Sequence, residues 1–269
     1  MNRRRASEAA RAETVLKLMN RSVELDALGA LAHAMGSETE SIELPDTVIA
    51  FDANVFLRLS GHPRSEDIVD FLGTGHENAL ILPGQVVQEF WNNQYLAVDS
   101  LAESIKKKHT ALKAELEKID SGFGEYADRF DALMTEFQTS YGYVFDENTV
   151  RRTSIFVSLL QEKAMVPYVP REIFRLLADV RRRTKTPPGF KDEGDGDFFV
   201  WADLLMGLSR LQDDGKTFKH VALVTKDRKM DWCRNGRPHP ILAAELKALT
   251  GASFVIWDLD VLASKLLDS

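Results

Sequence analysis

Short, fully apolar runs alternate with stretches of helical periodicity along this chain. Such runs, rich in β-branched residues and bounded by polar or turn residues, are typical of strands buried in a parallel sheet. The pattern predicts strands at residues 47–51, 79–82, 220–224 and 253–257. Helical segments separate all four, which indicates right-handed crossovers and a parallel sheet covered by helices on both faces.

Two further regions have helical patterns outside this alternation. Residues 6–35 carry apolar side chains at helical spacing and predict an N-terminal helix. The region 95–185 contains no convincing strand and predicts a helical insertion beside the sheet, an arm or a lid. We therefore divide the chain into an N-terminal helical extension, 1–44, and a domain, 45–269, that carries the insertion.

The apolar stripe on residues 15–31 has no predicted sheet of its own to cover. The N-terminal helix and the insertion are therefore candidates for homo-oligomer formation or for docking of a protein partner. Packing of the stripe onto the insertion would cover it equally well, and both alternatives stay open at this point.

Composition places the chain among globular proteins and narrows its chemistry. Hydrophobic residues make up 44% of the 269 positions and charged residues 28%, as in ordinary folded domains. The single cysteine, Cys233, excludes an intramolecular disulfide and a cysteine-cluster metal site. No apolar run reaches the roughly 18 residues that span a bilayer, and the basic start lacks the apolar region of a signal peptide. We expect a cytoplasmic protein that does not bind membranes.

The net charge of −7 by itself argues against a nucleic-acid partner. Nucleases with metal ions in carboxylate clusters are an exception, because the ions offset the local negative charge. Distribution also matters: residues 151–191 contain ten Lys and Arg residues and three acidic ones, a local net charge of +7.

Acidic residues follow the predicted strands at the places where parallel α/β sheets bind ligands, beyond the strands' carboxyl ends. Asp52 follows the first strand, and Asp227 lies just after the third. Glu89 lies in the first turns of the helix after the second strand, and Asp197 begins the helix before the third. The four acids from separate segments thus converge on one end of the sheet.

Acids in close proximity raise one another's pKa unless a cation lies between them. Carboxylate oxygens select Mg²⁺ or Mn²⁺, and two such ions about 3.5–4 Å apart can promote phosphodiester cleavage. Each acid alone has a structural explanation: Asp52 as a turn residue, Asp197 as a helix cap, Glu89 as a solvated helix residue and Asp227 as a loop residue. Their convergence favours the functional interpretation.

Several of these segments resemble the PIN-like nucleases, in particular the bacterial family with a long helical insertion. The segments that carry the resemblance are 48–56, 187–192, 196–201 and 224–232. The resemblance covers roughly residues 45–95 and 187–263, while the insertion matches only in being helical. It implies a three-layer α/β PIN-like fold with a central parallel sheet of about four to five strands.

The resemblance also implies a divalent-metal nuclease that uses Mg²⁺ or Mn²⁺ and cuts RNA or single-stranded or branched DNA, with RNA favoured. Asp52, Glu89, Asp197 and Asp227 match the metal-binding, catalytic acids, and we expect Asp52, Asp197 and Asp227 to share one ion with Glu89 bordering them.

Four other positions match the family in supporting roles: Asn54, Asp192, Thr225 and Asp231. Asn54 would orient Asp52 or a bound water, and Thr225 would hydrogen-bond near Asp227. Where the family commonly has two successive acids, this chain has Lys226 before Asp227, and Lys226 is instead a candidate for contact with substrate phosphate.

A groove leading to the acids is predicted from the basic residues around them. One side is formed by Arg181, Arg182, Arg183 and Lys185, and the other by Lys226, Arg228 and Lys229. Trp201 and Trp232 could stack on bases, but their apolar neighbours favour packing in the core.

Two other classes of function compete with the nuclease hypothesis. A catalytically inactive PIN-like module could hold nucleic acid or a partner protein through the basic insertion, although such a module has no need of four converging acids. A phosphatase of the haloacid-dehalogenase type requires a second Asp two residues after the nucleophile, and here that position is Asn54.

Overall fold

The computed structural model of the chain describes residues 2–36, 42–95, 107–115, 124–141 and 149–266. A five-stranded parallel sheet lies at the centre of the fold, with the order β3-β2-β1-β4-β7. Its strands are β1 (Thr47–Phe51), β2 (Leu80–Ile81), β3 (Ala164–Met165), β4 (His220–Val224) and β7 (Ser253–Trp257). A separate antiparallel pair consists of β5 (Cys233–Arg234) and β6 (Arg237–Pro238).

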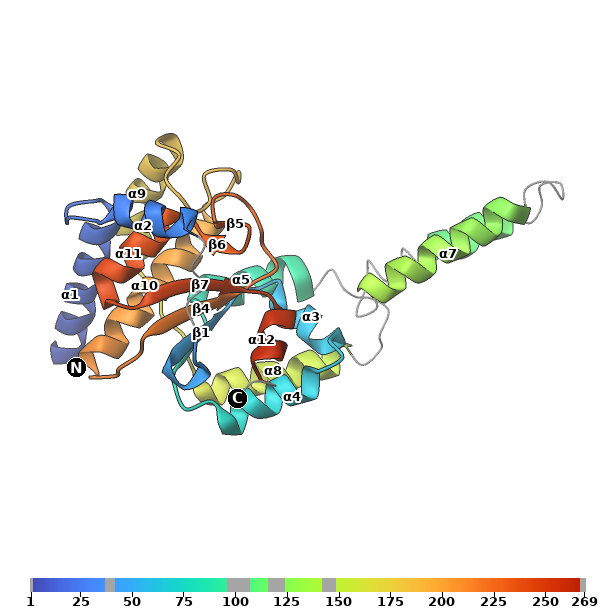
Figure 1. The fold of residues 1–269 in the computed structure, drawn as a ribbon, viewed down its shortest axis with the longest axis horizontal. Coiled ribbons are helices and arrows are strands. Elements are labelled where there is room, and N and C mark those ends of the chain that lie inside the picture. The colour runs from blue at the N-terminus through green and yellow to red at the C-terminus, as the bar shows by residue number, and fades with distance from the viewer. Residues whose placement is uncertain (1, 37–41, 96–106, 116–123, 142–148, 267–269) are drawn as a thin grey trace.

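Helices cover the sheet on both faces and give three layers (Figure 1). One layer contains α1 (Asn2–Met19), α2 (Ala27–Met35), α9 (Arg171–Arg183), α10 (Gly196–Asp213) and α11 (Pro240–Thr250). The other contains α3 (Val55–Gly61), α4 (Ser65–Asp70), α8 (Thr149–Lys163) and α12 (Leu259–Lys265). The remaining helical elements are η1 (Leu44–Asp46), η2 (Phe71–Gly75), α5 (Gly84–Glu89), η3 (Phe90–Tyr95) and α7 (Gly124–Tyr141).

The order in which strands are added to the sheet reverses between β1 and β4. Strands β2 and β3 extend it on one side of β1, whereas β4 and β7 extend it on the other. At such a switch point the connections after two neighbouring strands run to opposite faces and leave a crevice. The register pairs Phe51 with Val224, so Asp52 and Thr225, which follow them, lie side by side at this crevice.

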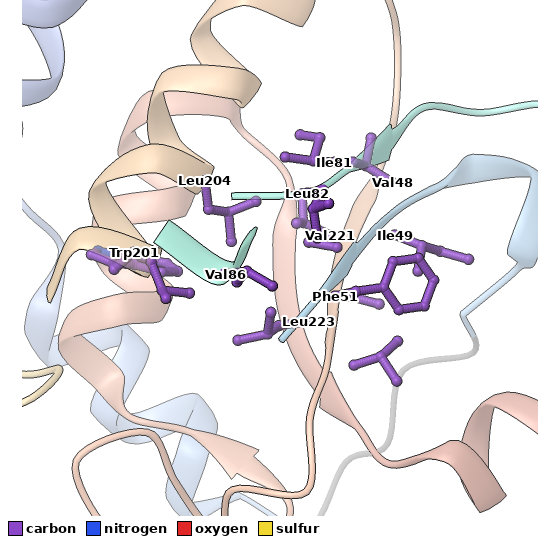
Figure 2. Packing of buried hydrophobic residues seen from close by; sticks show 14 of the residues in the cluster. Val48, Ile49, Phe51, Ile81, Leu82, Val86, Trp201, Leu204, Val221 and Leu223 are labelled. Carbon is purple, nitrogen blue, oxygen red and sulfur yellow. The ribbon is translucent and has the colours of Figure 1, made fainter. Parts of the chain in front are cut away.

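The core fixes β1, and with it the edge of the sheet that carries Asp52. All five residues of β1 are buried, and Figure 2 shows Val48, Ile49 and Phe51 within the hydrophobic cluster. The Phe51 ring packs edge-on against Phe156 of α8, with ring centroids 5.3 Å apart. On the other side of the sheet, Trp201 of α10 is fully buried. Helices on both faces therefore hold the strand end in place.

The predicted α/β fold class is confirmed, and three of the four predicted strands, β1, β4 and β7, have their predicted bounds. The second is shorter than predicted, at Leu80–Ile81. The expectation that the insertion contains no strand is wrong, because β3 follows α8 directly and pairs with β2. A strand of two residues is too short to leave a periodic pattern in the sequence.

The N-terminal region is two helices rather than the one predicted over residues 6–35. Helix α1 ends at Met19, and Arg21 adopts a left-handed conformation with φ of 55°. Asp26 then begins α2 as its N-cap, since its carboxylate accepts a hydrogen bond from the Gly29 amide at 2.8 Å.

The apolar stripe of the N-terminal region divides between these two helices. Val15 and Leu18 of α1 are buried, and α1 packs mainly on α10 and α11. Leu28 and Met35 of α2 remain exposed. Self-association or partner docking through α2 therefore stays a prediction. The apolar side chains Val15 and Leu18 of α1 are already covered by other helices of the same chain.

The described part of the insertion is mainly helical. Residues 107–115 form a helix, and Figure 1 shows α7 extending away from the sheet and its covering helices. Helices α8 and α9 instead belong to the two covering layers. Among the described residues, no helix is both long and apolar enough to cross a membrane.

We predict that His76, which follows η2, makes stability fall in mild acid. Burial lowers the pKa of His76 from 6.5 to about 4, so between these values protonation favours the unfolded chain. Stability should be full above pH 6.5 and decrease as the pH falls towards 4. After allowance for partial exposure, we expect His76→Gln to remove about 1 kcal/mol of the loss between pH 7 and pH 5. Urea unfolding of both proteins at these two pH values measures it, and an unchanged pH dependence would contradict it.

Candidate functional site

Asp52 lies at the carboxyl end of β1 and is held by three hydrogen-bond donors. The Ala53 amide donates to Oδ1 at 2.7 Å, and both Asn54 Nδ2 and Thr225 Oγ1 donate to Oδ2 at 2.6 Å. Because both carboxylate oxygens are engaged, the side chain has a fixed orientation. The contact expected between Asn54 and Asp52 is present.

Thr225 connects Asp52 to the loop that follows β4. Its hydroxyl oxygen accepts a hydrogen bond from the Asp227 amide at 2.9 Å. The Lys226 amide donates to Asn54 Oδ1 at 2.9 Å. The segments after the two central strands are thus joined, and the hydrogen bond expected between Thr225 and the neighbourhood of Asp227 is present.

Asp192 and Asp197 approach this loop from the start of α10. Asp197 lies in the first turn of the helix, as the sequence predicted, and the helix dipole favours a negative charge there. Trp232 Nε1 donates a hydrogen bond to Asp197 Oδ2 at 2.9 Å. Asp192 belongs to the loop that precedes the helix.

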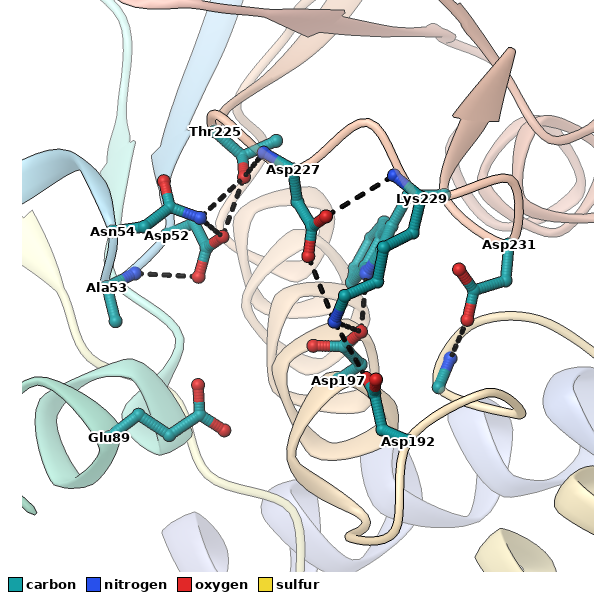
Figure 3. A network of polar contacts seen from close by, with 12 residues as sticks. Asp52, Ala53, Asn54, Glu89, Asp192, Asp197, Thr225, Asp227, Lys229 and Asp231 are labelled. Carbon is teal, nitrogen blue, oxygen red and sulfur yellow. Dashed lines mark hydrogen bonds and ion pairs between the residues drawn. The ribbon is translucent and has the colours of Figure 1, made fainter. Parts of the chain in front are cut away.

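The ammonium group of Lys229 lies among three of the acids (Figure 3). Its Nζ is 2.8 Å from Asp192 Oδ2, 3.1 Å from Asp227 Oδ2 and 3.3 Å from Asp197 Oδ2. Burial alone would lower the pKa of Lys229, but the hydrogen bond to Asp192 and the neighbouring negative charges raise it well above its usual value. Lys229 is therefore a positively charged centre within the cluster, not a residue on the far wall of a groove as predicted.

Glu89 borders the cluster from the last turn of α5. Gln85 Nε2 donates to Glu89 Oε1 at 3.0 Å. A Cβ atom on Gly196 would lie 2.3 Å from Glu89 Oε1, so the carboxylate is seated directly on the first residue of α10. A larger residue at position 196 would displace the Glu89 carboxylate from this place. Figure 3 shows the Glu89 side chain on the far side of the site from Lys229.

The pKa values of Asp52, Glu89, Asp192 and Asp197 are shifted from their usual values. Desolvation raises the pKa of Asp52 and of Glu89, and the charge of another acid adds to each: Asp227 for Asp52, and Asp52 for Glu89. Desolvation, followed by a hydrogen bond with Asp192, raises the pKa of Asp197 to about 7. For Asp192, desolvation is outweighed by the hydrogen bond from Lys229, so its pKa is lowered. The cluster thus carries more negative charge than this partly buried place readily accepts.

Whether Asp52, Asp197 and Asp227 share one ion stays a prediction. Within the described ranges, no three His, Cys, Asp or Glu side chains are arranged to hold a metal ion. In this structure Lys229 pairs with Asp192, Asp197 and Asp227, while hydroxyl, amide and backbone donors hold Asp52. The side chains of Asp52, Glu89, Asp197 and Asp227 offer only carboxylate oxygens as ligands. Such ligands fit a hard divalent cation.

Two further residues support the loop before α10. Asp231 is buried, and its Oδ2 accepts a hydrogen bond from the Gly189 amide at 3.0 Å, which ties the loop of Asp192 to the loop of Asp227. Trp201 and Trp232 are buried with their ring centroids 6.2 Å apart. The prediction that these tryptophans pack in the core is confirmed.

Arg181 was predicted to line a substrate groove, and this is wrong. Its side chain is buried and forms a two-bond ion pair with Glu245, with Nη–Oε distances of 2.7 and 3.1 Å. It also donates to the carbonyl oxygens of Met19 and Pro187. A basic run at a helix end gives no indication of which member faces inward, whereas helical periodicity with Phe174, Leu177 and Ala178 does.

The other basic residues predicted to bind substrate are partly or fully exposed. Arg182 pairs with Asp195, Arg183 with Asp179 and Arg228 with Asp258. Lys185 and Lys226 are exposed. These acidic partners weaken the positive field on which the predicted groove depends, and its role in binding stays a prediction.

Sequence reasoning missed Gln85, Gly196 and the central place of Lys229. Gln85 lies one helical turn before Glu89, so helix geometry could have indicated their contact. Lys229 lies two residues after Asp227, so its closeness in the loop could have indicated a place among the acids. The role of Gly196 depends on a contact with a residue far away in the sequence, which no local pattern encodes.

These features define an α/β protein with a carboxylate-rich polar site at the switch point of a parallel sheet. The family model described as a PIN like domain matches residues 48–244, and the chain belongs to the PIN-like domain family. The match includes the insertion, which the resemblance in sequence covered only as a helical region. No curated protein and no solved structure matches the chain.

Arg181 and Arg183 allow a matched test of buried and exposed arginines. Arg181→Ala should lower the free energy of unfolding by about 3–5 kcal/mol, because it leaves the Glu245 charge buried without its partner. Arg183→Ala should change it by less than about 1 kcal/mol, since its ion pair is exposed. Denaturant unfolding measures both. Equal effects of the two substitutions would contradict the assignment of Arg181 to the core.

Proposed function

We propose that this protein is a divalent-metal-dependent nuclease that hydrolyses phosphodiester bonds in RNA or in single-stranded or branched DNA. The observation that carries the proposal is the convergence of acids from four separated segments at the switch point, where Lys229 pairs with those of two of the segments. Membership of the PIN-like domain family supports it, because that fold is of the nuclease type.

The residues that would hold the metal are Asp52, Glu89, Asp197 and Asp227. Their oxygens form the hard donor set that Mg²⁺ and Mn²⁺ prefer. In such a site, a bound divalent ion supplies activation of water and neutralisation of the charge that develops on phosphate. The raised pKa values of Asp52 and Glu89 also favour this assignment, because a nearby cation stabilises their charged forms.

The protein's own contribution would be orientation. Asn54 and Thr225 hold Asp52 in one rotamer, and Trp232 fixes Asp197. Gln85 does the same for Glu89. A site whose acids are held by neighbouring donors loses little entropy when substrate binds, and such preorganisation is a large part of catalysis by positioning.

The substrate's phosphates would meet the positive residues of the loop after β4. Lys226 and Arg228 are exposed on this loop, and Lys229 reaches from it into the acids. Cations beside the acid cluster would offset the repulsion between the acidic protein and a polyanion. They would act over about one Debye length, ~8 Å at physiological salt.

Asp52→Asn should abolish nuclease activity without harming the fold. We expect cleavage of labelled RNA or DNA with Mn²⁺ or Mg²⁺ to fall at least about a hundredfold, and the melting temperature to stay the same or rise, because one repelling charge is removed. Asp260→Asn, at an exposed carboxylate on α12, is the matched control. Full activity of Asp52→Asn, or wild-type cleavage in EDTA, would contradict the proposal. Binding without any cleavage would favour the inactive module.

Lys229→Met should separate charge compensation from metal binding. Without metal, the variant should be less stable than wild type, because Asp192, Asp197 and Asp227 lose their shared cation. Its affinity for Mn²⁺ should rise at least about tenfold, since one positive charge leaves the cluster. Lys226→Met, on the same loop but exposed, should change both quantities less. Calorimetric titration with Mn²⁺ and thermal unfolding in EDTA measure them. A loss of Mn²⁺ affinity would mean that Lys229 organises the acids for the ion.

A further inference from the structure

Tyr168 is an exposed aromatic residue at the same edge of the sheet as the acids. It follows β3 by three residues, and the segment is anchored to the start of α5 by a hydrogen bond from the Gly84 amide to the Pro167 carbonyl at 3.0 Å. The Tyr168 residue is 55% exposed, so a large aromatic surface is open to contact from solvent.

The Tyr168 ring lies against the backbone of Gly84. A Cβ atom on Gly84 would lie 2.2–2.4 Å from three atoms of the ring, so the ring rests directly on the glycine backbone. Glycine at this position leaves room for the ring next to the first residue of α5. One side of the ring is packed, and much of the remainder faces solvent.

Arg171 provides a second planar group beside the ring. Its guanidinium carbon lies 5.7 Å from the centroid of Tyr168 and 4.3 Å from that of Phe199. Two hydrogen bonds to the fully buried Asp203, at 2.8 and 2.9 Å, hold the guanidinium in one plane. About a third of the Arg171 side chain, 36%, remains exposed.

A short chain of contacts leads from this aromatic and guanidinium platform to the acid cluster. Arg171 Nη2 contacts Gln85 Oε1 at 3.4 Å, and Gln85 Nε2 donates to Glu89 Oε1 at 3.0 Å. Asp203 also accepts a hydrogen bond from the Gln85 amide at 2.9 Å. The platform formed by Tyr168 and Arg171 is thus attached to the element that carries Glu89.

We propose that Tyr168, with Arg171 beside it, is a stacking site for an unpaired base of the nucleic-acid substrate; this rests on the proposed nuclease function. The face of an aromatic ring stacks on any base with little regard to sequence, and a neighbouring arginine adds to the attraction. Within a duplex both faces of a base are covered by its neighbours, so a base reaches such a ring only where it is unstacked. The site therefore selects single-stranded nucleic acid or unpaired junctions over continuous duplex.

Binding of short fluorescent oligonucleotides to full-length protein tests this inference. In an Asp52→Asn background, which keeps the probe intact, Tyr168→Ala should weaken the binding of single-stranded RNA or DNA about tenfold. Tyr168→Phe should bind as the parent does, because it retains the ring. Binding of a blunt duplex of the same sequence should be weaker in the parent and unchanged by Tyr168→Ala.

Tyr126→Ala is the matched control, because Tyr126 is a similarly exposed tyrosine, 57%, on the projecting helix α7. Thermal unfolding checks that each variant is folded. The inference is overturned if Tyr168→Ala leaves single-strand binding unchanged, if it weakens duplex binding equally, or if the parent binds no single strand. The proposed function fails separately: single-strand binding through Tyr168 without cleavage by wild-type protein would refute the nuclease and leave the stacking site standing.

Discussion

Compensation of crowded negative charge is the constraint on which this structure depends. Topology brings Asp52 and Asp227 to one switch point, and α5 and α10 add Glu89 and Asp197. Carboxylates gathered in a partly buried place disfavour their own ionised forms. The loop after β4 offsets this charge, because its Lys229 extends back to Asp192, Asp197 and Asp227. The contacts of Asp192, Asp197 and Asp227 with Lys229 follow from that arrangement.

The fold handles its buried acids in two different ways. Asp203 and Glu245 each have an arginine of their own, joined by two hydrogen bonds, and the planar guanidinium makes such pairs rigid. Three acids of the site, Asp192, Asp197 and Asp227, instead share the single ammonium of Lys229, which forms one contact with each. A flexible lysine is a replaceable partner, whereas a bidentate arginine is not. The difference separates acids that hold the fold together from acids available for chemistry.

Much of the architecture could be predicted from the sequence, because buried parallel strands are unbroken apolar runs and their carboxyl ends are easily found. That reasoning predicted the bounds of β1 and β4 and the place of Asp197 on its helix. It failed where a contact joins distant segments. Arg181 points towards Glu245, and the Glu89 carboxylate lies close to Gly196. It also failed at β3, where two residues pair with β2 without any pattern of their own.

The hydrogen bonds and ion pair of Arg181 limit how far the chain can be truncated at either end. The region shared with the family ends at residue 244, one residue before the carboxylate that neutralises Arg181, and it begins beyond α1, whose Met19 carbonyl accepts from the same guanidinium. It also omits β7, which covers the edge of β4. A fragment trimmed to those limits would bury an unpaired cation and expose an apolar strand edge, the combination that drives chains to aggregate. The segment that the family model matches is therefore shorter than the part of the chain that packs together.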